Sequence, residues 1–471
     1  MANPKVSVIV AVKNPADPKL GTLIRSIDLQ DLRPDELEEI YVVDDSGSAA
    51  DFSGSWGRGA VVNEGKGYVG ARNTGLRRAR GEYTVFADSD DCLLPNRLRS
   101  LLGVAQREGA KIVYHNYLYG DGDLNVVGVA QFPPRADIHQ LILWTYVSDF
   151  SLVHRSVWEE FGLLDESLGT YAMEDKWLRV VEKYPERVVL QPFPDMIYRQ
   201  SPGQMSRTIQ PQQGGLARKV KADCLARIGC PLPGWLGDLP RDLAEWSGYP
   251  VEVVNDRISK GEELAKEDWK MRDPRTEGEI LRYYRESMNV VWDLAQWHLS
   301  LNYWALYVSP WINAIPSGSM VLDFGAGICT LARYLRERKG CSVLAADLEG
   351  KALEFGNWAT LKRNSTAVYR ALKGDLADAG EFLSKIGKLD AIIALEFFGH
   401  VSQPERYLEL FSKALKPNGL LIFTLDFGGQ ETHPMHLHPE GEKQAFLLKF
   451  PELGLVPEGQ GGMAMWARKA S

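Results

Sequence analysis

Short apolar runs separated by polar turns recur along the N-terminal part of the chain and predict an α/β fold. Runs at residues 5–12, 40–43 and 83–87 are rich in β-branched and aromatic side chains, and each stops at polar or acidic residues. Such runs are typical of buried parallel strands. The apolar spacing over residues 20–30 predicts a helix after the first strand. We therefore expect an open sheet that binds its ligand at the carboxyl edge of its strands.

A second set of strand-like runs begins at residue 320. Strands are expected within residues 320–324, 342–346, 390–396 and 415–424, and a helix over 330–338. The alternation of strands with helical spacing predicts a second α/β unit.

The chain between these two sets has helical spacing. Helices are expected over residues 216–228, 241–247, 250–259, 261–269 and 277–299, the last of them rich in aromatic side chains. We expect three parts, namely a first domain over residues 1–210, a helical connector over 211–275 and a second domain over 276–471. The connector is either a plain spacer or an acceptor-binding module, and the aromatic helix either packs on the second domain or covers its pocket.

Composition places the chain among folded proteins and excludes several classes of partner. The 471 residues exceed one ordinary core, and the apolar content of 45% suits a folded protein. A formal charge of −8 argues against nonspecific binding to nucleic acid or anionic membrane. The five cysteines form no Cys-x-x-Cys pair, which favours reduced thiols. No apolar stretch approaches the roughly 20 residues that a membrane span needs. Because Met1–Lys5 run directly into a predicted strand, we expect no signal peptide. A cytoplasmic protein is therefore expected.

The acidic segment Asp88-Ser89-Asp90-Asp91 directly follows the strand-like run 83–87. Carboxylates one residue apart at a strand end point to the same side and repel each other unless a cation lies between them. A divalent cation that bridges a diphosphate is the usual occupant of such a site. Asp88 could hold a ribose hydroxyl and Asp90 the metal, while Asp45, after the neighbouring strand, could accept a hydrogen bond from a base.

Several further motifs occur in the order found in one family. They are Val6-Ser7-Val8-Ile9-Val10, Val43-Asp44-Asp45-Ser46, Gly70-Ala71-Arg72-Asn73-Thr74-Gly75, Gly81-Glu82-Tyr83, Asp88-Ser89-Asp90-Asp91, Phe161-Gly162-Leu163-Leu164-Asp165-Glu166, Glu174-Asp175 and Tyr198-Arg199. With them, residues 5 to about 207 resemble a family 2 glycosyltransferase of the GT-A fold. The resemblance implies a nucleotide-diphosphate sugar as donor and a glycan or glycoconjugate as acceptor.

The resemblance also implies roles for individual residues. The nucleotide sugar is expected to meet Ala11, Asp45, Arg72 and Asp88. Asp90 is expected to bind Mn²⁺ or Mg²⁺, and the Glu174-Asp175 pair to supply the catalytic base, with Asp175 as the base itself. Many relatives have a metal-binding His after the Tyr-Arg element, and here Gln200 follows instead. The ion is therefore expected to be held by Asp90, phosphates and water.

The second unit opens with an Asp-x-Gly-x-Gly turn, Asp323 to Gly327, between a predicted strand and helix. Glycines let the backbone approach a ligand closely. The spacing differs from the Gly-x-Gly-x-x-Gly of dinucleotide sites, and no Gly-Lys-Ser/Thr follows, which excludes a Walker loop. Asp347 ends the next predicted strand and suits ribose hydroxyls, and Asp375 could meet an adenine amino group.

This order of predicted strands, glycine turn and acidic residues resembles a class I S-adenosylmethionine (SAM)-dependent methyltransferase with a Rossmann-like fold. The resemblance implies that Asp323, Gly325 and Gly327 bind the methionine part of SAM, Asp347 the ribose and Asp375 the adenine. Glu396 to His400 are then expected to line the methyl-transfer face. Cys329 stands where the family often has a third glycine, and the end of the domain after Thr424 looks abbreviated.

Histidines supply the remaining chemical candidates. His400 could be the base that takes the proton of an acceptor hydroxyl, because imidazole titrates in the right range. The run His433 to His438 is expected to be a loop over the cofactor, and His436 with His438 could instead bind a metal.

We therefore expect a bifunctional enzyme that transfers a sugar and methylates a related acceptor, since tethering the two domains raises the effective concentration of a shared glycan. One alternative is a glycosyltransferase whose second domain is non-catalytic or regulatory. Another is a nucleotidyltransferase in the first half, although residues 13–17 lack the Gly-rich phosphate loop that this chemistry usually requires.

Overall fold

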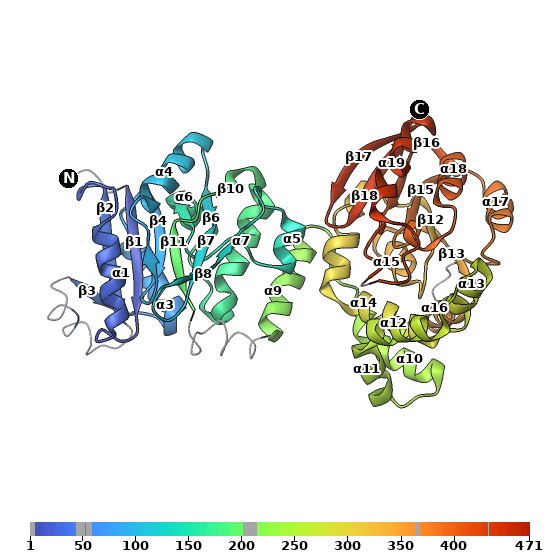
Figure 1. The fold of residues 1–471 in the computed structure, drawn as a ribbon, viewed down its shortest axis with the longest axis horizontal. Coiled ribbons are helices and arrows are strands. Elements are labelled where there is room, and N and C mark those ends of the chain that lie inside the picture. Colours follow the sequence, from blue (N-terminus) through green and yellow to red (C-terminus); the bar gives the residue numbers. More distant parts are fainter. Residues whose placement is uncertain (1–4, 44–51, 53–58, 201–213, 364–367, 432) are drawn as a thin grey trace. The chain divides into compact units, whose positions relative to one another are not determined.

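The computed structural model describes residues 5–43, 52, 59–200, 214–363, 368–431 and 433–471. The chain forms two compact units, Met1–Cys224 and Leu225–Ser471, and each has its own sheets and cores (Figure 1). Among the described residues, no helix combines the length and apolar character needed to cross a bilayer.

The N-terminal unit contains two sheets. The larger has the order β10-β6-β9-β4-β1-β2-β3, and the smaller has the order β5-β11-β7-β8. Within the larger sheet, β9 runs antiparallel to β4 and β6, while the other pairs are parallel. The strands are β1 Val6–Val12, β2 Leu37–Val43, β3 Ala60–Val62, β4 Tyr83–Asp88, β5 Cys92–Leu93, β6 Ile112–His115, β7 Tyr117–Gly120, β8 Val126–Ala130, β9 Leu152–His154, β10 Val188–Gln191 and β11 Met196–Arg199.

Helices cover both faces of the larger sheet. Val6, Val8, Val10 and Val12 of β1 share one buried core with α1 and α4, because alternate strand residues face the same side. On the opposite face, a side chain at Gly75 of α3 would collide with Ile9, so the glycine permits close helix–sheet packing. The helices are α1 Pro18–Asp28, α3 Gly67–Arg78, α4 Arg97–Glu108, α5 Ile138–Leu143, α6 Arg155–Phe161, α7 Ala172–Lys183 and α9 Gly214–Arg227.

The C-terminal unit is built on one seven-stranded sheet of order β14-β13-β12-β15-β16-β18-β17. The first five strands are parallel, and β18 runs antiparallel to both β16 and β17. The order reverses next to β12, so the carboxyl ends of β12 and β15 flank a switch point where such sheets bind ligands. The strands are β12 Met320–Phe324, β13 Ser342–Leu348, β14 Val368–Leu372, β15 Leu389–Ala394, β16 Leu415–Phe423, β17 Leu455–Gly461 and β18 Ala464–Lys469.

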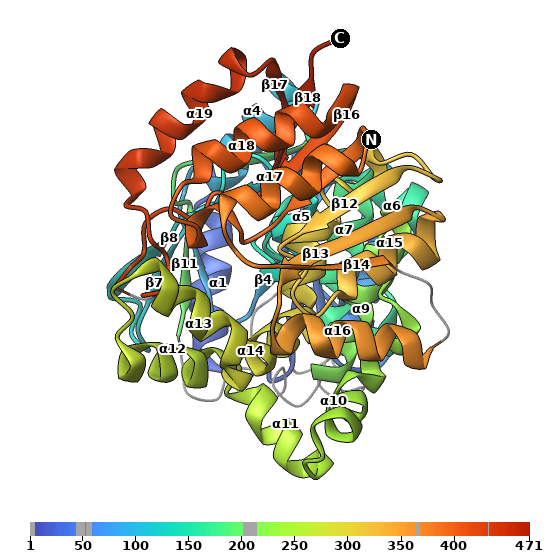
Figure 2. The same cartoon turned by 90° about the vertical axis from the view of Figure 1, so that its right-hand side faces the viewer.

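The helices of this unit, which Figure 2 shows around its sheet, contribute to two large buried cores. One joins α17, α18 and α19 to the strands, and the other joins α10, α11, α14 and α16. The helices are α10 Leu239–Ser247, α11 Val251–Ser259, α12 Gly261–Arg272, α13 Glu277–Glu286, α14 Met288–Leu299, α15 Thr330–Lys339, α16 Lys351–Lys362, α17 Leu376–Lys385, α18 Pro404–Ala414 and α19 Lys443–Glu452.

Three features of this unit differ from the sequence-based expectations. The aromatic segment 277–299 is two helices, because Ser287 ends α13 and caps α14 through its side chain. The end after Thr424 is not abbreviated, since α19, β17 and β18 complete the sheet. The helices expected in the connector, α9 to α12, are present; α9 crosses the boundary between the two units, and α10 to α12 belong to the C-terminal unit.

Candidate active sites

The N-terminal candidates gather at the carboxyl edge of β1 and β4. Ala11 and Asp88 are partners in the parallel register of these strands, so the two predicted nucleotide-binding residues are neighbours. Asp88 ends β4, and Asp90 and Asp91 follow in a turn. Asp45 lies outside the described residues.

Asp88 at the end of β4, with Asp90 and Asp91 after it, forms a group of acids in which burial disfavours the charged form. Burial raises the pKa of Asp88 and of Asp90, and burial together with Asp88 raises the pKa of Asp91 well above its usual range. Asp91 accepts from the backbone N–H of Arg199 (3.0 Å), while its Oδ2 is buried without a hydrogen-bond partner in the described chain. A divalent cation would relieve this charge, so the residues fit the expected metal site.

Two arginines lie beside these acids, Arg199, whose Nε donates to the backbone carbonyl of Asp90 (2.6 Å), and Arg72. The Arg72 guanidinium is buried and donates to Asp149 Oδ2 (2.6 Å) and to Asp88 Oδ1 (3.3 Å). It also lies over the rings of Tyr68 and Phe86, 4.7 and 4.9 Å from their centroids. Asp149 was missed by the sequence analysis, because it belongs to no motif and reaches Asp88 only through the fold.

Glu174 and Asp175 lie in the first turn of α7 and have different partners. Asp175 Oδ2 accepts from Arg179 Nε one turn later (2.7 Å). Glu174 Oε1 is 3.7 Å from Lys221 Nζ, and burial raises the pKa of Glu174, to which Asp149 also contributes. Both residues are buried.

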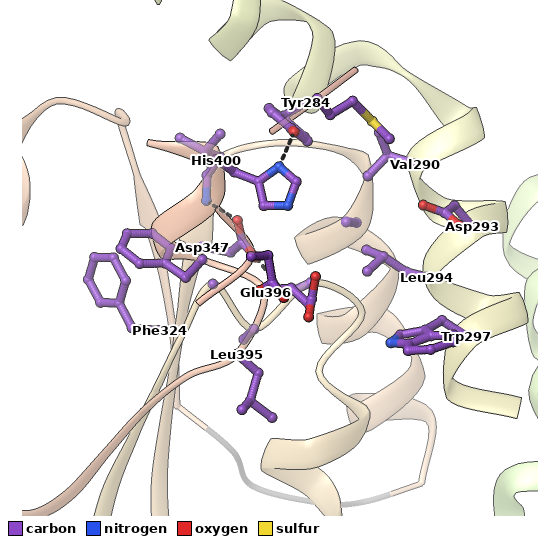
Figure 3. A pocket seen from close by; sticks show the side chains of 18 of the residues that line it. Tyr284, Val290, Asp293, Leu294, Trp297, Phe324, Asp347, Leu395, Glu396 and His400 are labelled. Carbon is purple, nitrogen blue, oxygen red and sulfur yellow. Dashed lines mark hydrogen bonds between the residues drawn. The ribbon is translucent and has the colours of Figure 1, made fainter. Parts of the chain in front are cut away.

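A cavity of about 630 Å³ opens at the carboxyl edge of the C-terminal sheet. Every methyltransferase residue predicted from the sequence lines it, namely Asp323, Gly325, Gly327, Asp347, Asp375, Glu396 and His400. Figure 3 shows Glu396 and His400 beside helical residues that include Tyr284, Leu294 and Trp297. The structure thus brings together side chains spread over more than 100 residues of sequence.

The glycine turn after β12 has a left-handed backbone. Gly325, Gly327 and Cys329 have φ values of 79°, 52° and 58°. A non-glycine residue rarely adopts such values, which explains why a glycine suits the position that Cys329 occupies. Gly327 N–H donates to Asp347 Oδ2 (2.5 Å), so the turn and the end of β13 are held together at the cavity wall.

Asp323 fits a positively charged ligand group. Its side chain is buried, and Oδ2 has no hydrogen-bond partner among the described residues. Burial, with the charge of Asp347, raises the pKa of Asp323 to about 7. SAM carries an ammonium and a sulfonium, either of which would stabilise the ionised carboxylate. Asp375, which also lines the cavity, caps α17 by accepting from the N–H of Asp378 (2.7 Å).

Glu396 and His400 are polar residues that line the same cavity. Burial and the neighbouring Asp426 raise the pKa of Glu396 well above its usual range. His400 Nδ1 is 2.9 Å from the hydroxyl of Tyr284, as Figure 3 shows. Burial and the nearby His436 lower the pKa of His400 to about 4, so the imidazole is neutral at neutral pH.

The three histidines between residues 433 and 438 have different surroundings. His433 and His436 line the cavity, as expected for a loop over the cofactor. His438 uses both ring nitrogens elsewhere, with Nδ1 2.9 Å from Glu442 Oε2 and Nε2 2.7 Å from the carbonyl of Val401. The pairing of His436 with His438 as metal ligands is therefore wrong, because His438 has no nitrogen left to offer.

Two polar residues beside Glu396, Asp426 and Tyr307, were not predicted from the sequence. Asp426 accepts from the hydroxyl of Thr424 (2.6 Å), and Tyr307 lies in the π-helical segment Tyr303–Val308. Both line the cavity. Irregular helical turns are frequent at functional sites, but π-helical geometry has no simple sequence signal.

Comparison with known proteins agrees with this division. The family described as "Glycosyl transferase family 2" matches residues 7–161, and the family described as "Methyltransferase domain" matches residues 322–421. These matches place a family 2 glycosyltransferase domain in the first half of the chain and a methyltransferase domain in the second.

Three relatives illustrate the two parts. The uncharacterized glycosyltransferase YwdF of Bacillus subtilis is 28% identical, over 41% of this chain and 74% of its own length. The succinoglycan biosynthesis protein ExoO of Rhizobium meliloti is 27% identical, over 44% of this chain and 64% of its own. A ubiquinone biosynthesis O-methyltransferase of Chelativorans sp. is 32% identical, over 22% of this chain and 39% of its own. The last two alignments cover less than two thirds of the relative. The chain thus joins a family 2 glycosyltransferase domain to a SAM-dependent methyltransferase domain.

Proposed function

We propose that this protein transfers a sugar from a nucleotide-diphosphate sugar to a glycan or glycoconjugate, and methylates such an acceptor on a sugar hydroxyl with SAM. The observation that carries the proposal is the single cavity lined by all seven predicted methyltransferase residues, together with the acids that follow β4 in the other unit. Because both proposed donors are metabolites of the cytoplasm, we propose that the protein acts there.

In the glycosyltransferase domain, the proposed nucleotide site comprises Ala11, Asp45, Arg72 and Asp88. Asp90 would hold Mn²⁺ or Mg²⁺, whose chemistry is to offset the charge that develops on the departing diphosphate. The Arg72 guanidinium orients Asp88 through their hydrogen bond. Asp175 is the proposed base that takes the proton of the acceptor hydroxyl, and attack opposite the leaving group would invert the anomeric centre. NMR of the product tests this, and retention of configuration would remove Asp175 from that role.

In the methyltransferase domain, SAM would be held by Asp323, Gly325, Gly327, Asp347 and Asp375. SAM supplies an activated methyl group at a sulfonium. The left-handed turn lets the backbone approach this ligand, and the buried Asp323 carboxylate would face its positive charge. Glu396 and His400 would face the acceptor.

The acceptor class rests on the glycosyltransferase relatives and on the fusion itself. ExoO is named for succinoglycan biosynthesis, which is the assembly of a polysaccharide. A tethered methyltransferase would meet the newly extended glycan at high effective concentration. We therefore propose a role in polysaccharide biosynthesis, in which methylation decorates or caps the chain.

Two variants of the full-length chain test the two activities separately. Asp90→Ala should abolish sugar transfer and leave methyl transfer unchanged, because the ion would lose its protein ligand. Asp323→Asn should weaken SAM binding about 10–100-fold, the range for losing a charged hydrogen bond, and leave sugar transfer unchanged. Loss of both activities in either variant, with unfolding excluded by circular dichroism, would contradict two independent sites.

A further inference from the structure

Glu396, His400 and His436 form a cluster whose composition is that of a metal site. One ligand atom of each residue lies within 4.8 Å of those of the other two. Glu396 and His400 follow β15, whereas His436 belongs to the segment between β16 and α19, so the cluster exists only in the folded protein. Two imidazoles and one carboxylate are a ligand set that binds divalent first-row transition metals and leaves further positions open.

Both imidazoles are oriented by a second hydrogen bond, as metal-binding histidines usually are. His436 Nδ1 is 2.9 Å from the carbonyl oxygen of Gly428. Because a carbonyl only accepts, Nδ1 of His436 carries the proton and Nε2 keeps its lone pair. His400 Nδ1 lies 2.9 Å from the hydroxyl of Tyr284, and the ring also contacts the backbone of Met435. A hydroxyl can accept from Nδ1–H, and in that tautomer Nε2 of His400 keeps its lone pair for a metal.

The third member, Glu396, is held in an unusual conformation with an unpartnered oxygen. Its backbone φ is 49°, a left-handed value that a non-glycine residue rarely adopts and that is found more often at functional sites. The N–H of Glu396 donates to Thr424 Oγ1 (2.7 Å), which helps to fix that conformation. Its Oε1 is buried and lacks a hydrogen-bond partner among the residues that the structure describes. A buried carboxylate oxygen without a partner is expected where a cation binds.

We propose that Glu396, His400 and His436 bind a divalent first-row transition-metal cation at the methyl-transfer face of the cavity. His400 is then a metal ligand and not the base expected from the sequence. Figure 3 shows the His400 ring hydrogen-bonded to Tyr284 on one side, with Glu396 on its other side. The role given to this cation rests on the proposed function, but its binding does not.

The open coordination positions indicate the acceptor. An acceptor with two adjacent hydroxyls, as in many sugars, would bind through both oxygens, and the cation would lower the pKa of the hydroxyl to be methylated. That hydroxyl releases its proton to solvent, and its oxygen forms a bond to the methyl carbon of SAM. The carbon–sulfur bond breaks with its electron pair on sulfur, so the sulfonium becomes a neutral thioether.

Metal binding is tested first, without SAM or acceptor. Bound metal is removed from the full-length chain with EDTA, and the chain is titrated with Co²⁺. Binding is monitored by calorimetry and by the visible absorption bands of Co²⁺, which report nitrogen ligation. The wild type should bind one nitrogen-ligated Co²⁺, and Glu396→Gln and His436→Gln should each weaken binding at least about tenfold. His438→Gln is the matched control and should bind as the wild type does, since both its ring nitrogens are used elsewhere. Equal affinity of all four proteins, or equal loss in the control, would overturn the site.

Tyr284→Phe tests the orienting hydrogen bond and keeps the ring. We expect about 10–100-fold weaker Co²⁺ binding, the range measured for loss of such a partner, with an unchanged thermal midpoint. Unchanged Co²⁺ affinity in this variant would count against the orienting role of Tyr284.

Methyl transfer then separates this proposal from the proposed function. EDTA should stop methyl transfer to a vicinal-diol glycan, and added Co²⁺ or Mn²⁺ should restore it. Methyl transfer that persists in EDTA, with no Co²⁺ bound, would refute the metal site and leave the methyltransferase function standing. Co²⁺ bound by the three residues without any methyl transfer would refute the function and leave the site.

Discussion

At the scale of single residues, Asp323 is the group whose ionisation should govern SAM binding. Its pKa is raised to about 7 in the folded protein, whereas an unperturbed aspartate titrates near pH 4. A cationic ligand favours the ionised form, so binding below about pH 7 must release a proton. Calorimetry should show SAM affinity rising up to about tenfold per pH unit from about pH 5 to about pH 7 and then levelling.

The same shift has the opposite effect on the ligand-free protein. A raised carboxyl pKa means that the folded state binds more protons than the unfolded state between about pH 4 and about pH 7. This contribution to stability is present at low pH and is lost as the pH rises through the folded pKa.

Asp323→Asn should flatten the pH dependence of SAM binding, and an unchanged slope in this variant would assign the proton to another group.

The Glu174-Asp175 pair allows a second test at this scale. Removing a general base usually costs about 10²–10⁴-fold in rate, so Asp175→Asn should lower kcat for sugar transfer by that amount with little change in KM for the donor. Glu174→Gln keeps the shape of the residue paired with Lys221 and should have a smaller effect. A larger loss in Glu174→Gln, measured as nucleotide release with acceptor present, would exchange the two roles.

Candidate site residues could be predicted where they belong to a short motif of adjacent residues. The turn from Asp323 to Gly327 and the acids at residues 88–91 were found because each combines a strand end with a short motif. Asp149, Tyr307 and Asp426 were not found, because each reaches its site through tertiary packing. His438 shows the opposite error. Its alternate spacing from His436 suggested a metal ligand, but its two ring nitrogens hydrogen-bond to Glu442 and Val401.

At the scale of elements, Ser287 determines how the helices over the cavity begin and end. Its Oγ accepts from the N–H of Asn289 (3.1 Å) and donates to the buried Asp268 (2.5 Å). Ser287→Ala removes the cap of α14 and leaves Asp268 without this donor. We expect a loss of about 1–3 kcal/mol in the free energy of unfolding of the C-terminal unit. Ser259→Ala, at an exposed serine, should stay within about 0.5 kcal/mol, and equal losses in urea denaturation would contradict the capping role.

Elements with a strong local pattern were predicted well, and those defined by distant pairing were not. The strands β1, β4, β12 and β15 are short and apolar, and most of their residues are buried. Strands β17 and β18 have mixed burial, and pairing with β16 defines them. The break at Ser287 was missed because helical spacing continues across a single non-helical residue.

At the scale of the whole molecule, the two compact units have separate cores and separate candidate sites. A ligand stabilises only the folded unit that binds it, by about 2.7 kcal/mol at 100 times its Kd. SAM should therefore raise the unfolding midpoint of one transition, and Mn²⁺ with UDP or another nucleoside diphosphate that of the other. In calorimetry of the full chain, one ligand shifting both transitions equally would show that the units do not unfold independently.

The central claim is that the acids after β4 allow this chain to use an activated sugar. The most direct measurement is nucleoside diphosphate release from a panel of UDP-, GDP- and dTDP-sugars with Mn²⁺, for the full-length wild type and for Asp90→Ala. The account predicts release from at least one donor by the wild type and none by the variant. No release from any donor, or equal release by both proteins, would contradict it.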